Sequence, residues 1–133
     1  MRNTAQYALN QLTTDSGAGS YTQMVFCEDY KNLKLELLKA WSNCTMTVKV
    51  YQSDSEARPN LWAAASATNK YTTIQVVDLK TGTAVNGDTG IAITADGIDV
   101  YSVNVDWARW IGLVCTSFTK GTLDVTATMY NDQ

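Results

Sequence analysis

The chain has 133 residues, of which 45% are hydrophobic and 17% are charged, and its formal net charge is −3. This length is typical of one domain, and this hydrophobic content is enough for a core and excludes a disordered chain. The ten basic side chains form no stripe, which argues against nucleic acid as a partner. No apolar run approaches the roughly 20 residues that cross a bilayer, which argues against a membrane.

The first twenty residues form a mostly polar segment that includes the glycine- and serine-rich stretch Asp15–Ser20. A short helix over Thr4–Leu12 is one interpretation, because Tyr7, Ala8 and Leu12 would share a face. A flexible arm, or an arm that orders against a neighbouring subunit, is the other interpretation. The segment lacks the apolar core of a secretory signal, so we expect the protein to be made in the cytoplasm.

Three apolar side chains of this segment are more hydrophobic than a free tail requires: Tyr7, Leu9 and Leu12. We therefore take them as candidate interface residues. The chain is divided into an N-terminal arm, residues 1–20, which is flexible or bound to a partner, and a β-domain, residues 21–133.

After the arm, apolar and polar residues alternate with a period of two. In Asn32–Leu38, Leu33, Leu35 and Leu37 fall on one face and Lys34 and Glu36 on the other. Such alternation is typical of antiparallel strands with one face in water. It predicts eight strands, in Met24–Cys27, Asn32–Leu38, Thr45–Tyr51, Tyr71–Leu79, Ile91–Ile93, Val100–Val105, Ala108–Phe118 and Thr122–Tyr130. We expect an all-β, antiparallel two-sheet sandwich, most simply of jelly-roll type, since doubling the sheet covers its edges.

A long loop interrupts the pattern between Gln52 and Asn69. Connections longer than about 12–15 residues are usually functional or lie against a partner. Candidate interface residues in this loop are Arg58, Pro59, Leu61 and Trp62.

Residues for catalysis or for cofactor binding are scarce. Histidine is absent, which removes the commonest general base and metal ligand. The cysteines, Cys27, Cys44 and Cys115, are too far apart for a zinc pattern and fit small buried hydrophobes. No glycine-rich phosphate loop follows a strand. We expect no catalytic, cofactor-binding or metal-binding residue, and therefore a protein that is not an enzyme.

The four tryptophans allow a different reading, because exposed aromatic side chains serve both sugar binding and protein interfaces. Trp110 fits core or inter-sheet packing. Trp62, with Tyr71 or Trp107, would serve a carbohydrate-binding or receptor-binding module. The sequence leaves this alternative open.

Two segments resemble small virion proteins of tailed bacteriophages. They are Val48–Ser55, which is followed by an Arg-Pro loop, and Ala108–Val114, which leads into Thr119–Leu123. Over residues 44–130 the chain is similar to the jelly-roll decoration, or cement, proteins on the outside of phage heads.

This resemblance implies a virion structural protein that bridges neighbouring capsid subunits. Its partner would be the major capsid protein, its site the outer surface of the capsid, and its state a homo-oligomer, dimer or trimer. In such proteins terminal arms and long loops make the bridging contacts, which would suit residues 1–20 and the Gln52–Asn69 loop.

Overall fold

The computed structural model describes residues 3–15, 20–21, 24–39, 46–61, 63–95, 97–118 and 120–131, with side chains described for 24–38, 46–61, 63–95, 97–115 and 123–131. These residues form strands, turns and loops, and the described part of the chain contains no helix that would span a membrane. The strands are β1 (Asn3–Asp15), β2 (Ser20–Tyr21), β3 (Val25–Phe26), β4 (Asn32–Lys39), β5 (Met46–Ser53), β6 (Thr72–Thr73), β7 (Val76–Asp78), β8 (Ala84–Val85), β9 (Ile91–Ile93), β10 (Gly97–Asn104), β11 (Trp110–Phe118) and β12 (Lys120–Asn131).

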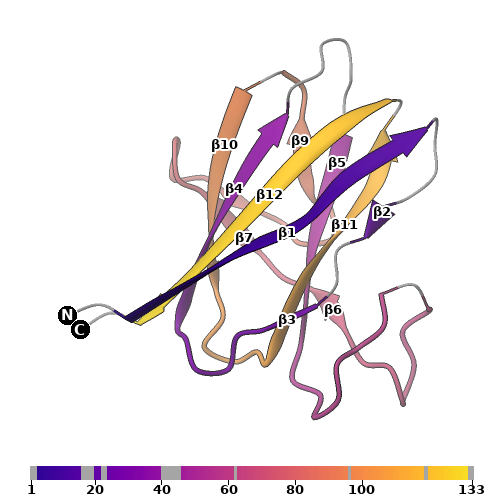
Figure 1. Cartoon of the computed structure of the whole chain (residues 1–133), viewed down its shortest axis with the longest axis vertical. Helices are drawn as coiled ribbons and strands as arrows, with labels where there is room; N and C mark the ends of the chain where they lie inside the picture. The colour runs from indigo at the N-terminus through magenta and orange to yellow at the C-terminus, as the bar shows by residue number, and fades with distance from the viewer. Residues whose placement is uncertain are drawn as a thin grey trace.

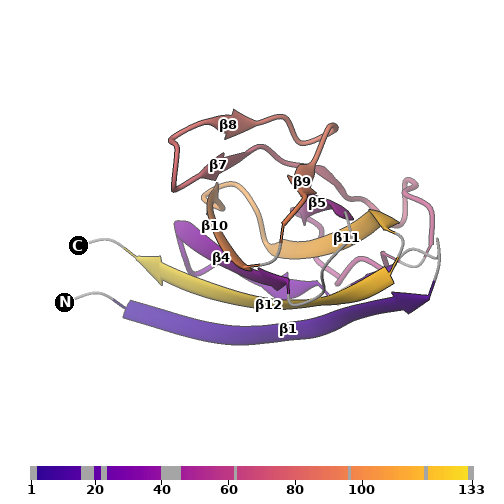
Figure 2. The same cartoon turned by 90° about the horizontal axis from the view of Figure 1, so that it is seen from above.

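The strands form two antiparallel sheets, which confirms the all-β sandwich (Figures 1 and 2). Sheet A has the order β1-β12-β4-β10-β7-β8, and sheet B has the order β2-β11-β5-β6, with β3 beside β11 and β9 beside β5. Eight of these strands, β1, β2, β4, β5, β9, β10, β11 and β12, can be numbered 1 to 8 along the chain. Sheet A then contains 1-8-3-6 and sheet B contains 2-7-4-5, which is the strand order of a jelly roll.

The core lies between the two sheets and comes from the predicted alternation. Leu33, Leu35 and Leu37 of β4 are at most 1% exposed, and they face Val48 and Val50 of β5 across the sandwich. The other large buried side chains come mainly from β9, β10, β11 and β12 and include Ile91, Ile93, Val103, Ile111, Leu113, Leu123, Val125 and Met129. Burial of this continuous apolar layer is the main source of stability.

Residues 3–15 of the N-terminal segment form one long strand, so the helical interpretation of Thr4–Leu12 is wrong. Strand β1 pairs antiparallel with β12 from Asn3↔Asn131 to Asp15↔Lys120, with one irregularity between Leu9 and Leu12. Figure 2 shows β1 at the margin of sheet A, with β12 beside it and β4 beyond. This pairing gives the backbone N–H and C=O groups on one side of β1 hydrogen-bond partners in β12. In a helix, these groups would have bonded to one another.

The predicted strand Tyr71–Leu79 is two strands that belong to different sheets. β6 pairs with β5 in sheet B, and β7 pairs with β10 in sheet A. Between them the chain crosses the sandwich at Ile74, whose backbone N–H still donates to the carbonyl oxygen of Val50. The hairpin from β7 to β8 turns at Gly82, which has φ of 74°, a conformation that glycine adopts at little cost.

Candidate functional site

The loop between β5 and β6, residues 54–71, is held by the side-chain amide of Asn69. Its Oδ1 accepts from the backbone N–H of Asn60, and its Nδ2 donates to the carbonyl oxygen of the same residue, both at 2.8 Å. The Tyr71 hydroxyl adds a 2.6 Å hydrogen bond to the carbonyl oxygen of Ala63. These bonds fold the loop onto itself, so it is an organised structure rather than a loose excursion.

A second, smaller hydrophobic cluster lies under this loop, on the outer face of sheet B. Leu61 is 5% exposed and packs with Met24 and Val114, next to the half-buried rings of Tyr51, Tyr71 and Trp110. Gly112 permits this contact, because a Cβ there would lie 3.0 Å from Leu61 Cδ1. The loop is therefore anchored on its own sheet by apolar burial.

The predicted interface residues of the loop have different environments. Pro59 and Leu61 are buried within the chain, which gives them a role in its own packing. Arg58 is exposed, and its guanidinium lies 5.9 Å from the centre of the Trp110 ring, a cation–π geometry. Trp62 lies outside the described residues. Contact between this loop and a partner stays a prediction.

The predicted interface residues of the arm lie in β1. Tyr7 is opposite Ala127, Leu9 opposite Val125, and Leu12 opposite Leu123. Their side chains lie outside the described set, so their part in an interface also stays a prediction.

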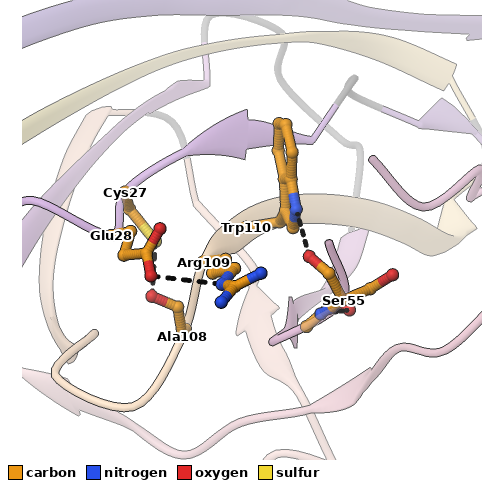
Figure 3. A network of polar contacts seen from close by, with 7 residues as sticks. Cys27, Glu28, Ser55, Ala108, Arg109 and Trp110 are labelled. Carbon is orange, nitrogen blue, oxygen red and sulfur yellow. Dashed lines mark hydrogen bonds and ion pairs between the residues drawn. The ribbon is translucent and has the colours of Figure 1, made fainter. Parts of the chain in front are cut away.

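Where β11 begins, polar contacts join it to two neighbouring segments (Figure 3). The first segment contains Cys27. Its backbone N–H donates to the carbonyl oxygen of Arg109 at 2.7 Å, and its thiol donates to the carbonyl oxygen of Ala108 at 3.6 Å. The Arg109 guanidinium also contacts Glu28, with Nε 3.1 Å from Oε1. On the other side, the Arg109 N–H donates to the carbonyl oxygen of Ser53.

The Cys27 thiol belongs to this network but is not a reactive nucleophile. It is fully buried, and burial, with a smaller contribution from the Glu28 carboxylate, raises its pKa to about 12. A thiol nucleophile acts as the thiolate. At neutral pH Cys27 is therefore protonated and serves as a packed hydrogen-bond donor.

The network supports a tight turn that carries Trp107. The backbone N–H of Ala108 donates to the carbonyl oxygen of Val105, and the N–H of Asp106 donates to Asn104 Oδ1. Val105 and Ala108, on either side of the tip, are buried, whereas Trp107 is 88% exposed. A large apolar ring is thus held in water on a fixed turn.

Of the two tryptophans in this region, Trp110 differs from the sequence expectation. Trp110 is half-buried, but it packs in the outer cluster against Phe26, with ring centres 5.3 Å apart, and not in the main core. Its indole Nε1 reaches the carbonyl oxygen of Ser55. Trp107, one possible sugar contact predicted from the sequence, is exposed because it lies in the turn before β11 and not in the strand.

Two open hollows flank the long loop. One, of about 260 Å³, is lined by Gln52, Ser53, Asp54, Ala65, Ser66, Lys70, Tyr71 and Thr72. The other, of about 450 Å³, is lined by Asp54, Ser55, Glu56, Ala57, Ala67, Thr68 and Lys70. Within the described ranges no three histidine, cysteine or acidic side chains lie close enough to hold a metal ion. The exposed Trp107 ring and the hydrogen-bonded long loop are the best-defined surface features of the described residues.

Comparison with known proteins shows which fold the chain shares, and nothing more. No family model and no curated protein sequence matches the chain. The crystal structure of the SPBc2 prophage-derived protein YomS superimposes with a TM-score of 0.70, over 98% of this chain and 96% of that one, at 8% sequence identity. The Yersinia pseudotuberculosis-derived mitogen gives a TM-score of 0.39 at 11% identity, over 100% of this chain and 88% of that chain. The jelly roll is thus shared, over nearly its full length, with a protein derived from a prophage.

Proposed function

We propose that this protein is a virion structural protein that decorates a phage capsid and cements it by bridging neighbouring shell subunits. In this proposal its partner is the major capsid protein, it lies on the outer surface of the virion after synthesis in the host cytoplasm, and it acts as a homo-oligomer. It performs no catalysis and binds neither nucleic acid nor membrane.

The observation that carries the proposal is the near-complete match of the fold to a prophage-derived protein. Fold alone does not assign function, so the proposal also depends on the surface at one end of the sandwich. There, the turn of Trp107 and the loop of residues 54–71 are both held by hydrogen bonds and buried apolar contacts. A surface that is already ordered loses little conformational entropy when it binds.

The test is sedimentation of the purified protein with capsids that lack it. We expect the wild-type protein to sediment with the capsids, and the Trp107→Ala variant to bind at least tenfold more weakly, because exposed tryptophans are frequent interface hot spots. Leu79→Ala is the matched control, since Leu79 is also exposed, at 48%, but lies after β7 in sheet A. A wild-type protein that stays in the supernatant would contradict the proposal.

A second candidate function, a carbohydrate-binding or receptor-binding module, is favoured by one observation. Trp107 presents its ring almost completely to water, as a stacking platform for a sugar would. Tyr71, by contrast, makes its contacts within the chain. Its hydroxyl donates to the carbonyl oxygen of Ala63, and its ring makes an edge-to-face contact with Tyr51. A glycan array with wild-type and Trp107→Ala protein separates the two functions: a glycan signal that the variant loses supports the module.

A further inference from the structure

The edges of the two sheets differ sharply in length. The edge strands β2, β3, β6 and β8 have two residues each, and β9 has three. β1 has thirteen residues, and its one ladder partner among the described strands is β12. A long edge presents a row of backbone N–H and C=O groups that can pair with another chain.

The sequence of β1 has none of the features that usually protect a long edge. Residues 3–14 contain no charged side chain and no proline, the two commonest devices that prevent edge-to-edge pairing. The single irregularity lies between Leu9 and Leu12, which leaves a regular ladder over residues 3–9. This half of β1 is therefore suited to accept a further strand.

We propose that β1 pairs antiparallel, edge to edge, with β1 of a second copy of this chain, so that sheet A continues across a two-fold dimer. A two-fold contact uses the same strand on both copies and leaves no new free edge, so it closes as a dimer and does not propagate. The absence of charge favours a second copy as occupant, because identical residues that meet across the axis do not repel one another.

The proposal also specifies an approximate register. Pairing of the regular half, residues 3–9, with itself places Gln6 near the two-fold axis, opposite Gln6 of the partner subunit. A charge at this position would then meet an identical charge. The inference rests on the homo-oligomer of the proposed function and specifies the strand through which its subunits pair. Its test requires no capsid.

The experiment measures the oligomeric state of the purified full chain by sedimentation equilibrium. We expect the wild-type protein to be a dimer, and Gln6→Lys and Gln6→Glu each to raise the dimer dissociation constant at least tenfold. An equimolar mixture of these two variants should recover the dimer, because lysine then faces glutamate. Thr126→Lys is the matched control: it adds the same charge in β12, opposite Glu36 of β4, and should remain dimeric.

Two further measurements keep the test decisive. Circular dichroism melting shows that each variant is folded, and Gln6→Cys should give a disulfide-linked dimer on mild oxidation, whereas Thr126→Cys should not. A monomeric wild-type protein, or charge variants as dimeric as wild type, would overturn the proposal. If the wild-type protein is a monomer that binds capsids, the β1 dimer is wrong and the proposed function stands. If it is a dimer that does not bind capsids, the proposed function is wrong and the β1 dimer stands.

Discussion

The indole Nε1 of Trp110 donates a 2.9 Å hydrogen bond to the backbone carbonyl oxygen of Ser55. Through this bond the start of β11 fixes the chain just after β5, where the long loop begins. The Trp110 ring also packs against Phe26 and lies under the Arg58 guanidinium. The Trp110 side chain thus connects β11, β3 and the long loop, at the end of the sandwich that we propose contacts the capsid.

Replacement of Trp110 by phenylalanine should lower the free energy of unfolding by about 1 kcal/mol, the usual net contribution of one hydrogen bond. Urea denaturation provides the measurement. Trp107→Phe is the matched control, because Trp107 is exposed and surface substitutions usually change stability by less than about 0.5 kcal/mol. Equal effects of the two changes would show that the Ser55 bond contributes nothing.

Asn69→Ala should loosen the long loop without unfolding the sandwich. The change removes the paired 2.8 Å bonds to Asn60 and weaker contacts with the carbonyl oxygens of Ala63 and Ala64. We expect faster amide hydrogen exchange and faster proteolysis within residues 60–70, because local openings depend on local contacts. Thr68→Ala, which removes a 3.4 Å contact with Ser66, should leave both rates unchanged. A variant as protected as wild type would mean that the Asn69 amide does not hold the loop, and that the contacts of Leu61 and Tyr71 are sufficient.

Gly112→Ala should lower the free energy of unfolding by about 1–2 kcal/mol, because the new methyl group would crowd Leu61 Cδ1 and Met24 Sδ. Leu61→Ala alone should cost about 2–3 kcal/mol through lost burial. In the double variant the shortened side chain leaves room for the methyl group, so the combined loss should be smaller than the sum of the two single losses. Additive losses in urea denaturation would argue against this contact.

Stability should fall at alkaline pH. Burial, followed by Asp99 and Asp78, raises the pKa of Tyr101 to about 12, and burial raises that of Cys27 to about 12. Because both folded-state pKa values lie above their ordinary values of 10.0 and 9.0, the folded state retains these protons longer than the unfolded state. The stabilisation from Cys27 is complete below pH 9 and is lost between pH 9 and about 12, and that from Tyr101 is complete below pH 10 and is lost between pH 10 and about 12. Within its own window each group lowers the free energy of unfolding by at most about 1.4 kcal/mol per pH unit.

Unfolding curves measured in urea between pH 8 and pH 12 test this loss. A Cys27→Ala variant starts less stable, but its stability should decline less steeply above pH 9, since one of the two groups is gone. Parallel curves for the variant and the wild type would show that the Cys27 thiol does not contribute to the pH dependence.

The sequence predicted the sandwich because its core strands alternate so clearly, as Leu33, Leu35 and Leu37 do in β4. It failed where the structure depends on distant partners. Strand β1 has no strong alternation of its own and is defined by its ladder with β12. Strands β6 and β7 look like one continuous strand in the sequence. They belong to different sheets, because β6 pairs with β5 and β7 pairs with β10.

The site could be predicted only in part, for a similar reason. The long loop was visible as a break in the pattern, but no local signal showed that Leu61 packs on Met24 and Val114, which are remote in sequence. Trp107 and Trp110 are near neighbours of the same type, and only the turn at Val105–Ala108 separates an exposed ring from a packed one.

The pairing of β1 with β12 also has a consequence for the order in which the protein folds. Strand β1 is synthesised long before its ladder partner, β12, because most of the described strands lie between them in the sequence. The ladder between β1 and β12 in sheet A therefore cannot form until β12 has been made, and until then the uncharged segment of residues 3–14 lacks its partner within the chain. Folding dominated by such non-local pairing is slow. The newly made chain should depend on chaperones during this interval more than a helical protein of the same length would.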